Sequence, residues 1–152
     1  MRTQQIARRA LVRAAVWLAA QAVLFVLGRL LARRFDEGDE STAGIRRVKV
    51  LGGFELAPRN PELTRVRIDL VLAGAELDLT GITETTGIDL TVTTVMAGMA
   101  VKVPPDWRVW SRFLGVGGLG TDGGVQRTSD EHTADLRVHG RALFGGIGVE
   151  VG

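Results

Sequence analysis

A glycine-centred phrase recurs five times between residues 53 and 146 of this 152-residue chain, and it constrains the fold more than any other feature. In each copy, alternating apolar positions surround a glycine. Periods of about 20 to 50 residues are typical of stacked repeats. The glycines are Gly53, Gly74, Gly98, Gly118 and Gly146, at intervals of 21, 24, 20 and 28 residues. The spacing predicts a mainly β fold, a β-solenoid (single-stranded parallel β-helix-like) of about five rungs.

Residues 66–79 show the pattern most clearly, because apolar residues alternate with polar ones on both sides of Gly74. A period of two predicts strands, and the single interruption predicts a bend. Glycine accepts positive φ and lets neighbouring backbones approach closely. The five glycines are therefore predicted to form the structural corners. An antiparallel β-sandwich stays open as the alternative, because its hairpins also use glycine and the intervals are unequal.

Four aspartates each follow one apolar residue and precede another within the repeat region: Asp69, Asp78, Asp89 and Asp135. Such a series suggests either an acidic ladder that holds calcium or a solvated outer face. Calcium loops need several clustered oxygen ligands, and this spacing does not supply them. We interpret the aspartates as a solvated face and predict no metal.

The N-terminal segment has a different character, because residues 14–28 carry no charge and arginines flank both ends. A helix over residues 10–32 would be roughly 35 Å long, enough to cross a hydrocarbon core of about 30 Å. We predict one transmembrane helix at residues 10–34, a basic tail at 1–9, an acidic linker at 35–44 and a β domain at 45–152. The predicted membrane-anchor residues are Trp17, Leu18, Leu24, Phe25 and Leu27.

The sequence does not assign the side of the membrane on which the β domain lies, because arginines flank both ends of residues 14–28 and the positive-inside rule then gives no orientation. An interfacial or partner-packed helix and a cleaved signal peptide are the weaker interpretations of this segment. The arginines of the first 34 residues account for much of the basic charge. Nucleic-acid binding needs a basic stripe on the folded domain, so no nucleic-acid partner is predicted.

A candidate interaction face follows the break at Pro104 and Pro105. Alternation through residues 107–113 sends Trp107 and its alternate neighbours to one side, and Arg108, Trp110 and Arg112 to the other. A face of interleaved basic and aromatic groups can meet lipid headgroups, an acidic partner or a nucleic-acid strand. The simpler interpretation is a tryptophan packed beside two arginine stems.

Residues that would carry catalysis do not form a recognisable set. The chain has no cysteine and two histidines, His132 and His139, without matching ligand or nucleophile spacing. No glycine phrase continues into the Gly-Lys-Ser/Thr of a phosphate-binding loop, and no nucleophile-elbow sequence is present. We predict a non-enzymatic protein with no catalytic residues and no cofactor.

The C-terminal two-thirds resembles a known family. The phrase at residues 101–109, with Val103, Asp106, Trp107 and Val109, and the glycine-rich ending at 144–151 look like the C-terminal domain of LiaF-like proteins, also called cell-wall-active antibiotics response proteins. The resemblance covers residues 45–152. It implies a bacterial membrane protein whose β-rich domain restrains a sensor histidine kinase of the cell envelope stress response. Family members usually carry several membrane spans, whereas this chain has one candidate.

These observations lead to a membrane-anchored β domain at the cell membrane that acts through protein–protein contacts, with a sensor histidine kinase as the partner that the resemblance implies. Residues 10–34 would contact the lipid bilayer. A self-assembling scaffold is the second hypothesis, because a solenoid exposes strand edges at its ends and residues 145–151 would form an uncovered last rung. A surface-exposed, adhesin-like binding module is the third.

Overall fold

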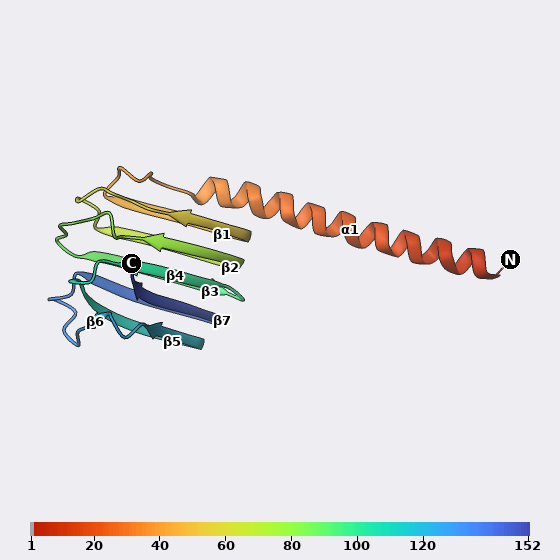
Figure 1. Cartoon of the computed structure of the whole chain (residues 1–152). Coiled ribbons are helices and arrows are strands. Elements are labelled where there is room, and N and C mark those ends of the chain that lie inside the picture. The colour runs from red at the N-terminus through yellow and green to blue at the C-terminus, as the bar shows by residue number, and fades with distance from the viewer. Residues whose placement is uncertain (1) are drawn as a thin grey trace.

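One long helix precedes seven strands in this computed structural model, which describes the backbone of residues 2–152 and the side chains of residues 14–23, 25–30 and 34–152 (Figure 1). The mainly β fold with one N-terminal helix is confirmed. The helix covers residues 2–9 of the predicted tail, and Met1 lies outside the described residues. The elements are α1 (Arg2–Phe35), β1 (Gly44–Leu56), β2 (Arg65–Asp78), β3 (Ile88–Val95), β4 (Gly98–Val103), β5 (Arg108–Thr121), β6 (Gln126–Arg127) and β7 (Leu136–Val151).

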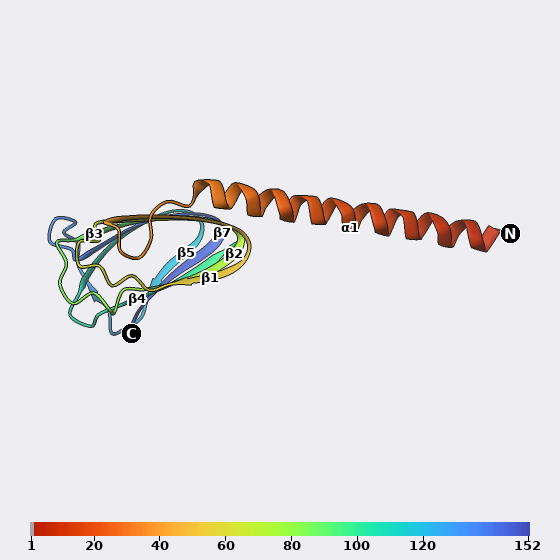
Figure 2. The ribbon, with the colours of Figure 1, turned by 90° about the horizontal axis from the view of Figure 1, so that it is seen from above.

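The strands form one parallel sheet in the order β1-β2-β3-β7-β5-β6, and β4 pairs with β2 and β7. The first half of β2 pairs with β3 and its second half with β4, and β7 is divided in the same way. The four strands β2, β3, β7 and β4 thus form a closed circuit of neighbours, and the sheet folds over on itself (Figure 2). The antiparallel sandwich alternative is wrong, since every pairing between these strands is parallel. We call residues 44–151 the β stack.

The five predicted glycines lie side by side in adjacent strands. Gly53 pairs with Gly74, Gly74 with Gly98, and Gly146 with both Gly98 and Gly118. These five paired glycines form what we call the glycine ladder. The prediction that they make the corners by taking positive φ is wrong, because none of the five has a positive φ.

The bend itself lies two residues before each ladder glycine in β1, β2, β7 and the β3–β4 junction. Its left-handed positions hold large apolar residues: Leu51 (φ 63°), Leu72 (φ 49°), Met96 (φ 48°) and Phe144 (φ 58°). A positive φ is rare for bulky residues, since the Cβ crowds the backbone. Because four such residues stack at one bend, we infer that the packing of neighbouring levels overrides the preference of bulky residues for negative φ.

Strand β5 bends differently, with a register shift between Val116 and Gly117 relative to β7. Gly115 and Gly117 have φ of 133° and 137°, and a Cβ on either would overlap a carbonyl oxygen of β7, that of Ala142 or of Gly145. At these two positions only glycine fits. Sequence inspection selected Gly118 instead, where a Cβ would meet nothing within 4 Å.

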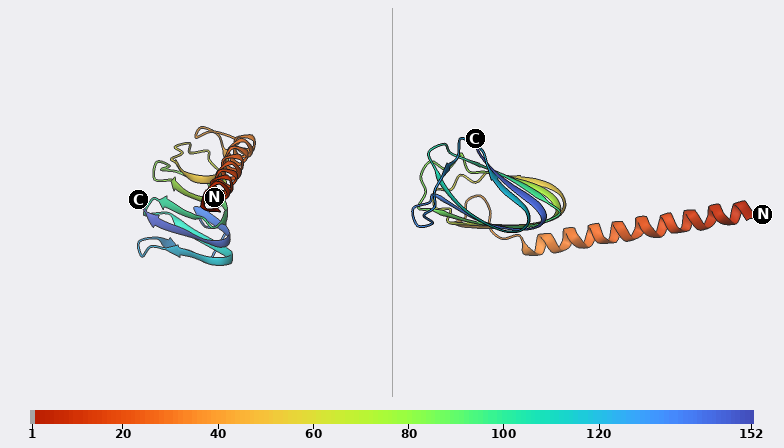
Figure 3. Two further views of the ribbon diagram at one scale, coloured as in Figure 1. Left: turned by 90° about the vertical axis from the view of Figure 1, so that its right-hand side faces the viewer. Right: turned by 90° about the horizontal axis from the view of Figure 1, so that it is seen from below.

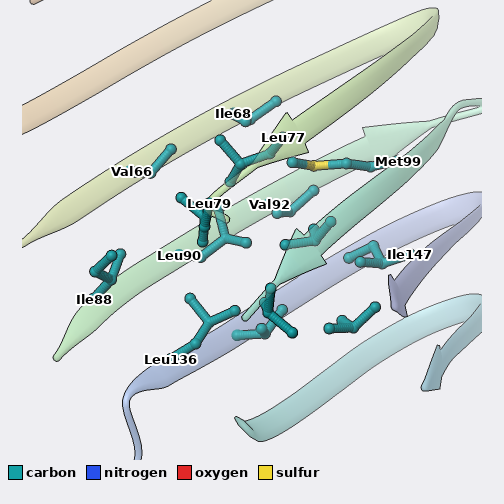
Figure 4. Close-up of a cluster of buried hydrophobic side chains, with 14 of the residues drawn as sticks. Val66, Ile68, Leu77, Leu79, Ile88, Leu90, Val92, Met99, Leu136 and Ile147 are labelled. Carbon is teal, nitrogen blue, oxygen red and sulfur yellow. The ribbon is translucent and has the colours of Figure 1, made fainter. Parts of the chain in front are cut away.

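The core fills the space between the two halves of the folded sheet (Figure 4). Strand β3 shows the underlying alternation, since every second residue from Ile88 to Thr94 is buried. Side chains from facing halves meet there, for example Leu90, Leu77 and Leu136, which are all fully buried. Burial of one such side chain contributes about 1.5–3 kcal/mol. Apolar alternation on both sides of each bend therefore stabilises the fold.

The chain order of the stack differs from the expected one. Strand β7, the last in sequence, lies between β5 on one side and β3 and β4 on the other. Residues 146–149 are thus paired on both sides and residues 145, 150 and 151 on one, so the prediction of an uncovered last rung there is wrong. The terminal strands of the stack are β1 and β5, and β6 covers only Arg108 and Val109 of the β5 edge.

The acidic linker covers part of the β1 edge. Glu37 forms an antiparallel bridge with Arg46, and the Val48 backbone N–H donates to the Asp36 carboxylate at 2.8 Å. Arg47 Nη1 donates to the Gly38 carbonyl at 2.8 Å. An open strand edge invites pairing with other chains, and such contacts block it. The linker is therefore part of the fold as well as a connection.

The C-terminal part of helix α1 packs on β1, and its N-terminal part extends beyond the bends of the stack (Figures 1 and 3). Gly28 is buried at this contact, where a Cβ would lie 3.0 Å from Cγ1 of Val50. Glycine thus permits the close approach of helix and strand. Among the residues described, no helix has the length and apolar character required to cross a membrane.

Candidate functional site

The predicted interaction face lies on the outer side of β5 and continues onto β7. Trp107 and Val109 are 4% and 2% exposed, while Arg108 and Arg112 are exposed and Trp110 is half-buried. The predicted alternation is confirmed for these residues. Across the sheet the register brings β7 side chains beside them, with Trp110 opposite Arg137 and Arg112 opposite His139.

Arg108 is engaged in a structural contact. Its Nε lies 3.4 Å from Oδ2 of Asp135, and its backbone N–H donates to the same oxygen at 2.8 Å. Asp135 immediately precedes β7. This pair joins the beginnings of β5 and β7, so Arg108 contributes less to an outward binding face than the sequence suggests.

Trp110 lies beside a residue that the sequence pattern does not place near it. Its ring centroid is 5.3 Å from that of His139, with the planes inclined at 58°. Such tilted contacts between rings add to the stability from burial alone. The Glu131 carboxylate lies 4.0 Å from Nε2 of His139. Trp110 is thereby held against β7, with part of its surface accessible.

Arg112 lines a cavity of about 390 Å³ on this face together with His139 and Arg141. Phe113, Leu114 and Gly140 complete the lining. Guanidinium groups bind carboxylates and phosphates through paired hydrogen bonds. We call Trp110, Arg112, His139 and Arg141 the basic face. Its chemistry favours an anionic group carried by a partner.

Arg137, also on this side of β7, is already paired. Its Nε donates to Oδ1 of Asp89 at 2.5 Å. The hydrogen bond from Arg137 lowers the pKa of Asp89 and the bond to Asp89 raises the pKa of Arg137, with burial opposing both shifts. The charge of Arg137 is therefore balanced, which leaves Arg112 and Arg141 as the cations of the basic face.

The other aspartates of the predicted series also have local partners. Asp69 accepts from Nε of Arg67 at 3.1 Å, and the Thr80 hydroxyl and backbone N–H lower the pKa of Asp78 by donating to it. These carboxylates stabilise strands and strand ends. Within the described part of the chain, no three His, Asp or Glu side chains gather as a metal site would require.

The predicted anchor residues of α1 are exposed where their side chains are described. Trp17 and Leu18 are 64% and 62% exposed, and Phe25 and Leu27 are about half exposed. Leu24 lies outside the described side chains. Neighbours on other sides of the helix, such as Val16 and Val23, are exposed as well. The apolar surface of residues 14–23 therefore surrounds the helix and is exposed, whereas the β stack covers part of the helix near Gly28.

Sequence reasoning missed an exposed apolar surface at the bend. We define the apolar corner as six large apolar side chains at or next to the bend, exposed by 48–71%: Leu72, Met96, Leu114, Val116, Leu143 and Phe144. A signal was present, because two consecutive large apolar residues interrupt the alternation shortly before four of the five ladder glycines, in residues 50–53, 71–74, 95–98 and 143–146. Such doublets mark where the chain stops alternating between inside and outside.

In comparisons with known proteins, no family model, no curated protein and no solved structure matches the chain.

Proposed function

We propose that this chain is a non-enzymatic β-solenoid protein, held at a bacterial cell membrane by α1, that acts through protein–protein contacts of its basic face. The observation that carries membrane attachment is the all-round apolar exposure of α1. A helix that is apolar on all sides is stable when lipid or other apolar helices surround it. Residues 14–28 of the sequence carry no charge, and arginines flank them at positions suited to headgroups.

The solenoid description rests on five parallel, bent levels of chain: β1, β2, β3 with β4, β7, and β5. Four of them bend at equivalent residues, and β5 bends beside them through Gly115 and Gly117. In such a stack each level contacts mainly its neighbours, and the outer surfaces are long and rigid. Rigid outer surfaces suit the recognition of another protein. The resemblance to LiaF-like proteins supplies the class of partner, a sensor histidine kinase of the envelope stress response.

Membrane attachment is tested by extraction. The full chain, expressed in bacteria, should stay in the membrane fraction after alkaline carbonate treatment. A double variant Leu18→Glu, Val23→Glu places two carboxylates on the exposed apolar helix, where each costs a few kcal/mol in lipid, and should be released. Ser129→Glu, in an exposed loop, is the control. A full chain that carbonate releases as readily as the double variant would contradict the proposed anchor.

Partner contact is tested by photo-crosslinking from the basic face. A photoreactive amino acid at Arg112 should capture a membrane sensor kinase, and the same group at Ser129 should not. Arg112→Glu should then change kinase-dependent reporter output in cells, because it reverses the charge of the face. Capture of no protein specific to position 112, together with unchanged reporter output, would contradict a regulatory contact there.

Self-assembly is a second candidate, supported by the outer edge of β5, of which β6 covers only two residues. An uncovered edge is a template for pairing with another chain. At the opposite end, the linker and α1 cover part of β1. Sedimentation of the detergent-solubilised chain should show concentration-dependent growth if the two ends join, and one species across the concentration range would exclude this function.

A further inference from the structure

The structure carries a second apolar surface besides α1. The six side chains of the apolar corner point outward at the bend, in a row that crosses β2, β7, β5 and the β3–β4 junction. Neighbouring parallel strands are about 4.8 Å apart, so the row extends roughly 15–20 Å. Soluble domains rarely expose a contiguous apolar surface without a binding role. We propose that the apolar corner is immersed in the surface layer of the lipid bilayer that receives α1.

Backbone strain supports a role for this surface. Leu72, Met96 and Phe144 hold positive φ angles while their side chains are 48–64% exposed. Glycine or asparagine would occupy this backbone region with less strain. Large apolar residues are unfavourable at these positions for two reasons: the positive φ strains the backbone, and water solvates the apolar side chains poorly. Contact with lipid removes the second and gives the strained residues a function.

The position of α1 selects lipid as the occupant. Phe25 and Arg29 of α1 line one cavity together with Val50, Leu51 and Gly52 at the bend of β1. The helix residues before this contact extend away from the stack, on the same side as the bends (Figures 1 and 2). The uncharged run of α1 thus ends level with the corner. A bilayer that accommodates residues 14–28 has its surface at the apolar corner.

Charge complementarity agrees with this position. Arg29 of α1, Lys49 of β1 and Arg141 of β7 each lie within a few residues of the helix–corner contact or of the corner itself. Cations just behind an apolar edge reach the phosphate groups of lipids, while apolar side chains enter the boundary with the acyl chains to about 5–10 Å. The nearby acid Asp69 is paired with Arg67. Glu55 lines a cavity with Lys49 beyond the bend. Asp36, which lines the cavity of Arg29 and Lys49, accepts a hydrogen bond from the Val48 backbone N–H.

The proposal rests on membrane attachment through α1, so its test reads the two separately. The chain has no cysteine, and single cysteines can carry an environment-sensitive fluorophore in the full-length protein. Met96→Cys and Leu114→Cys report on the corner, Ala15→Cys reports on α1, and Glu84→Cys is an exposed control in the loop between β2 and β3. Two corner positions are labelled so that a folding defect in one variant does not decide the result.

The labelled chains are reconstituted in vesicles of phosphatidylcholine and phosphatidylglycerol. Doxyl-labelled lipid quenches fluorophores in the bilayer, and iodide quenches those in water. The corner labels should be quenched by doxyl lipid at least about two-fold more strongly than the Glu84 label, as expected for interfacial depth. The Glu84 label should respond to iodide alone.

Each other outcome decides a separate point. A lipid-quenched label at Ala15 with corner labels open to iodide overturns the corner proposal and leaves membrane attachment standing. An Ala15 label open to iodide contradicts attachment through α1, while the corner variants, reconstituted in vesicles of the same composition, still decide whether the corner contacts lipid. Corner labels shielded from both quenchers would show that protein covers the corner, which overturns the proposal.

Discussion

Two adjacent glycines in β5 differ in why they are glycine: one is required because a side chain would clash with β7, and the other only continues the repeat pattern. Gly117 has φ 137°, and a Cβ there would overlap the carbonyl oxygen of Gly145. Gly118 belongs to the glycine ladder, yet a Cβ on it would meet nothing within 4 Å. Gly117→Ala and Gly118→Ala add the same methyl group one residue apart. Only the first should destabilise the protein.

The size of the effect follows from two terms. An alanine in a sparsely populated backbone region costs about 1–3 kcal/mol. Displacement of β5 from β7 near Gly145 would weaken about two ladder hydrogen bonds, each contributing about 0.5–1.5 kcal/mol. The free energy of unfolding should fall by about 2–6 kcal/mol for Gly117→Ala. Gly118→Ala should change it by at most about 0.5 kcal/mol, as at an exposed site without contacts.

Thermal unfolding in detergent micelles, followed by near-ultraviolet circular dichroism of the packed tryptophans Trp107 and Trp110, measures the difference. For a chain of this size about 2–4 °C of melting temperature corresponds to 1 kcal/mol, so Gly117→Ala should melt about 10 °C below the parent. Gly115→Ala should behave like Gly117→Ala, because its Cβ would overlap Ala142. Equal melting temperatures for the Gly117 and Gly118 variants would refute the assigned roles.

Three further substitutions test other contacts. Arg137 lowers the folded-state pKa of Asp89, so the pair stabilises the fold above the unfolded pKa near 3.8, and this stabilisation is lost as the pH falls through the lower folded pKa. Asp89→Asn should lower the unfolding free energy by about 1 kcal/mol at pH 7, allowing for a half-exposed carboxylate. In guanidinium unfolding, the difference in stability between parent and variant should shrink toward pH 2. The Thr94 hydroxyl is buried without a hydrogen-bond partner among the described residues, so Thr94→Val should raise the unfolding free energy by about 1 kcal/mol, and a loss of stability would contradict that description. Gly28→Leu should force α1 away from Val50 and speed amide exchange in the last helical turns, whereas unchanged exchange would show that the helix does not depend on this contact.

The sequence predicted what repetition controls. Alternating apolar residues on both sides of Gly74 require two strands around one core, and in the parallel stack Gly74 lies level with its equivalents Gly53 and Gly98. It did not predict which residues take the left-handed backbone. Local preference assigns positive φ to glycine, yet the packing of stacked levels places Leu72 and Met96 there.

The candidate face was predicted in part. Alternation correctly separated Trp107 from Trp110 because it depends only on neighbours along β5. The partners of the face come from β7 and the residue before it: Asp135 for Arg108 and His139 for Trp110, 27 and 29 residues further along the chain. Parallel repeats of similar composition can pair in several orders, so one sequence does not specify these neighbours.

The insertion of β7 between β5 and its other neighbours has a consequence for biosynthesis. Ribosomes deliver β1 to β4 first, and these can pair as they emerge, but β5 finds no place until Leu136–Val151 has been made. Most of the structure then depends on contacts between distant parts of the chain, which slows folding. A nascent chain therefore waits with two unsatisfied edges, one on β3 with β4 and one on β5. The final strand closes both at once, so a prematurely terminated product would be prone to aggregation and degradation.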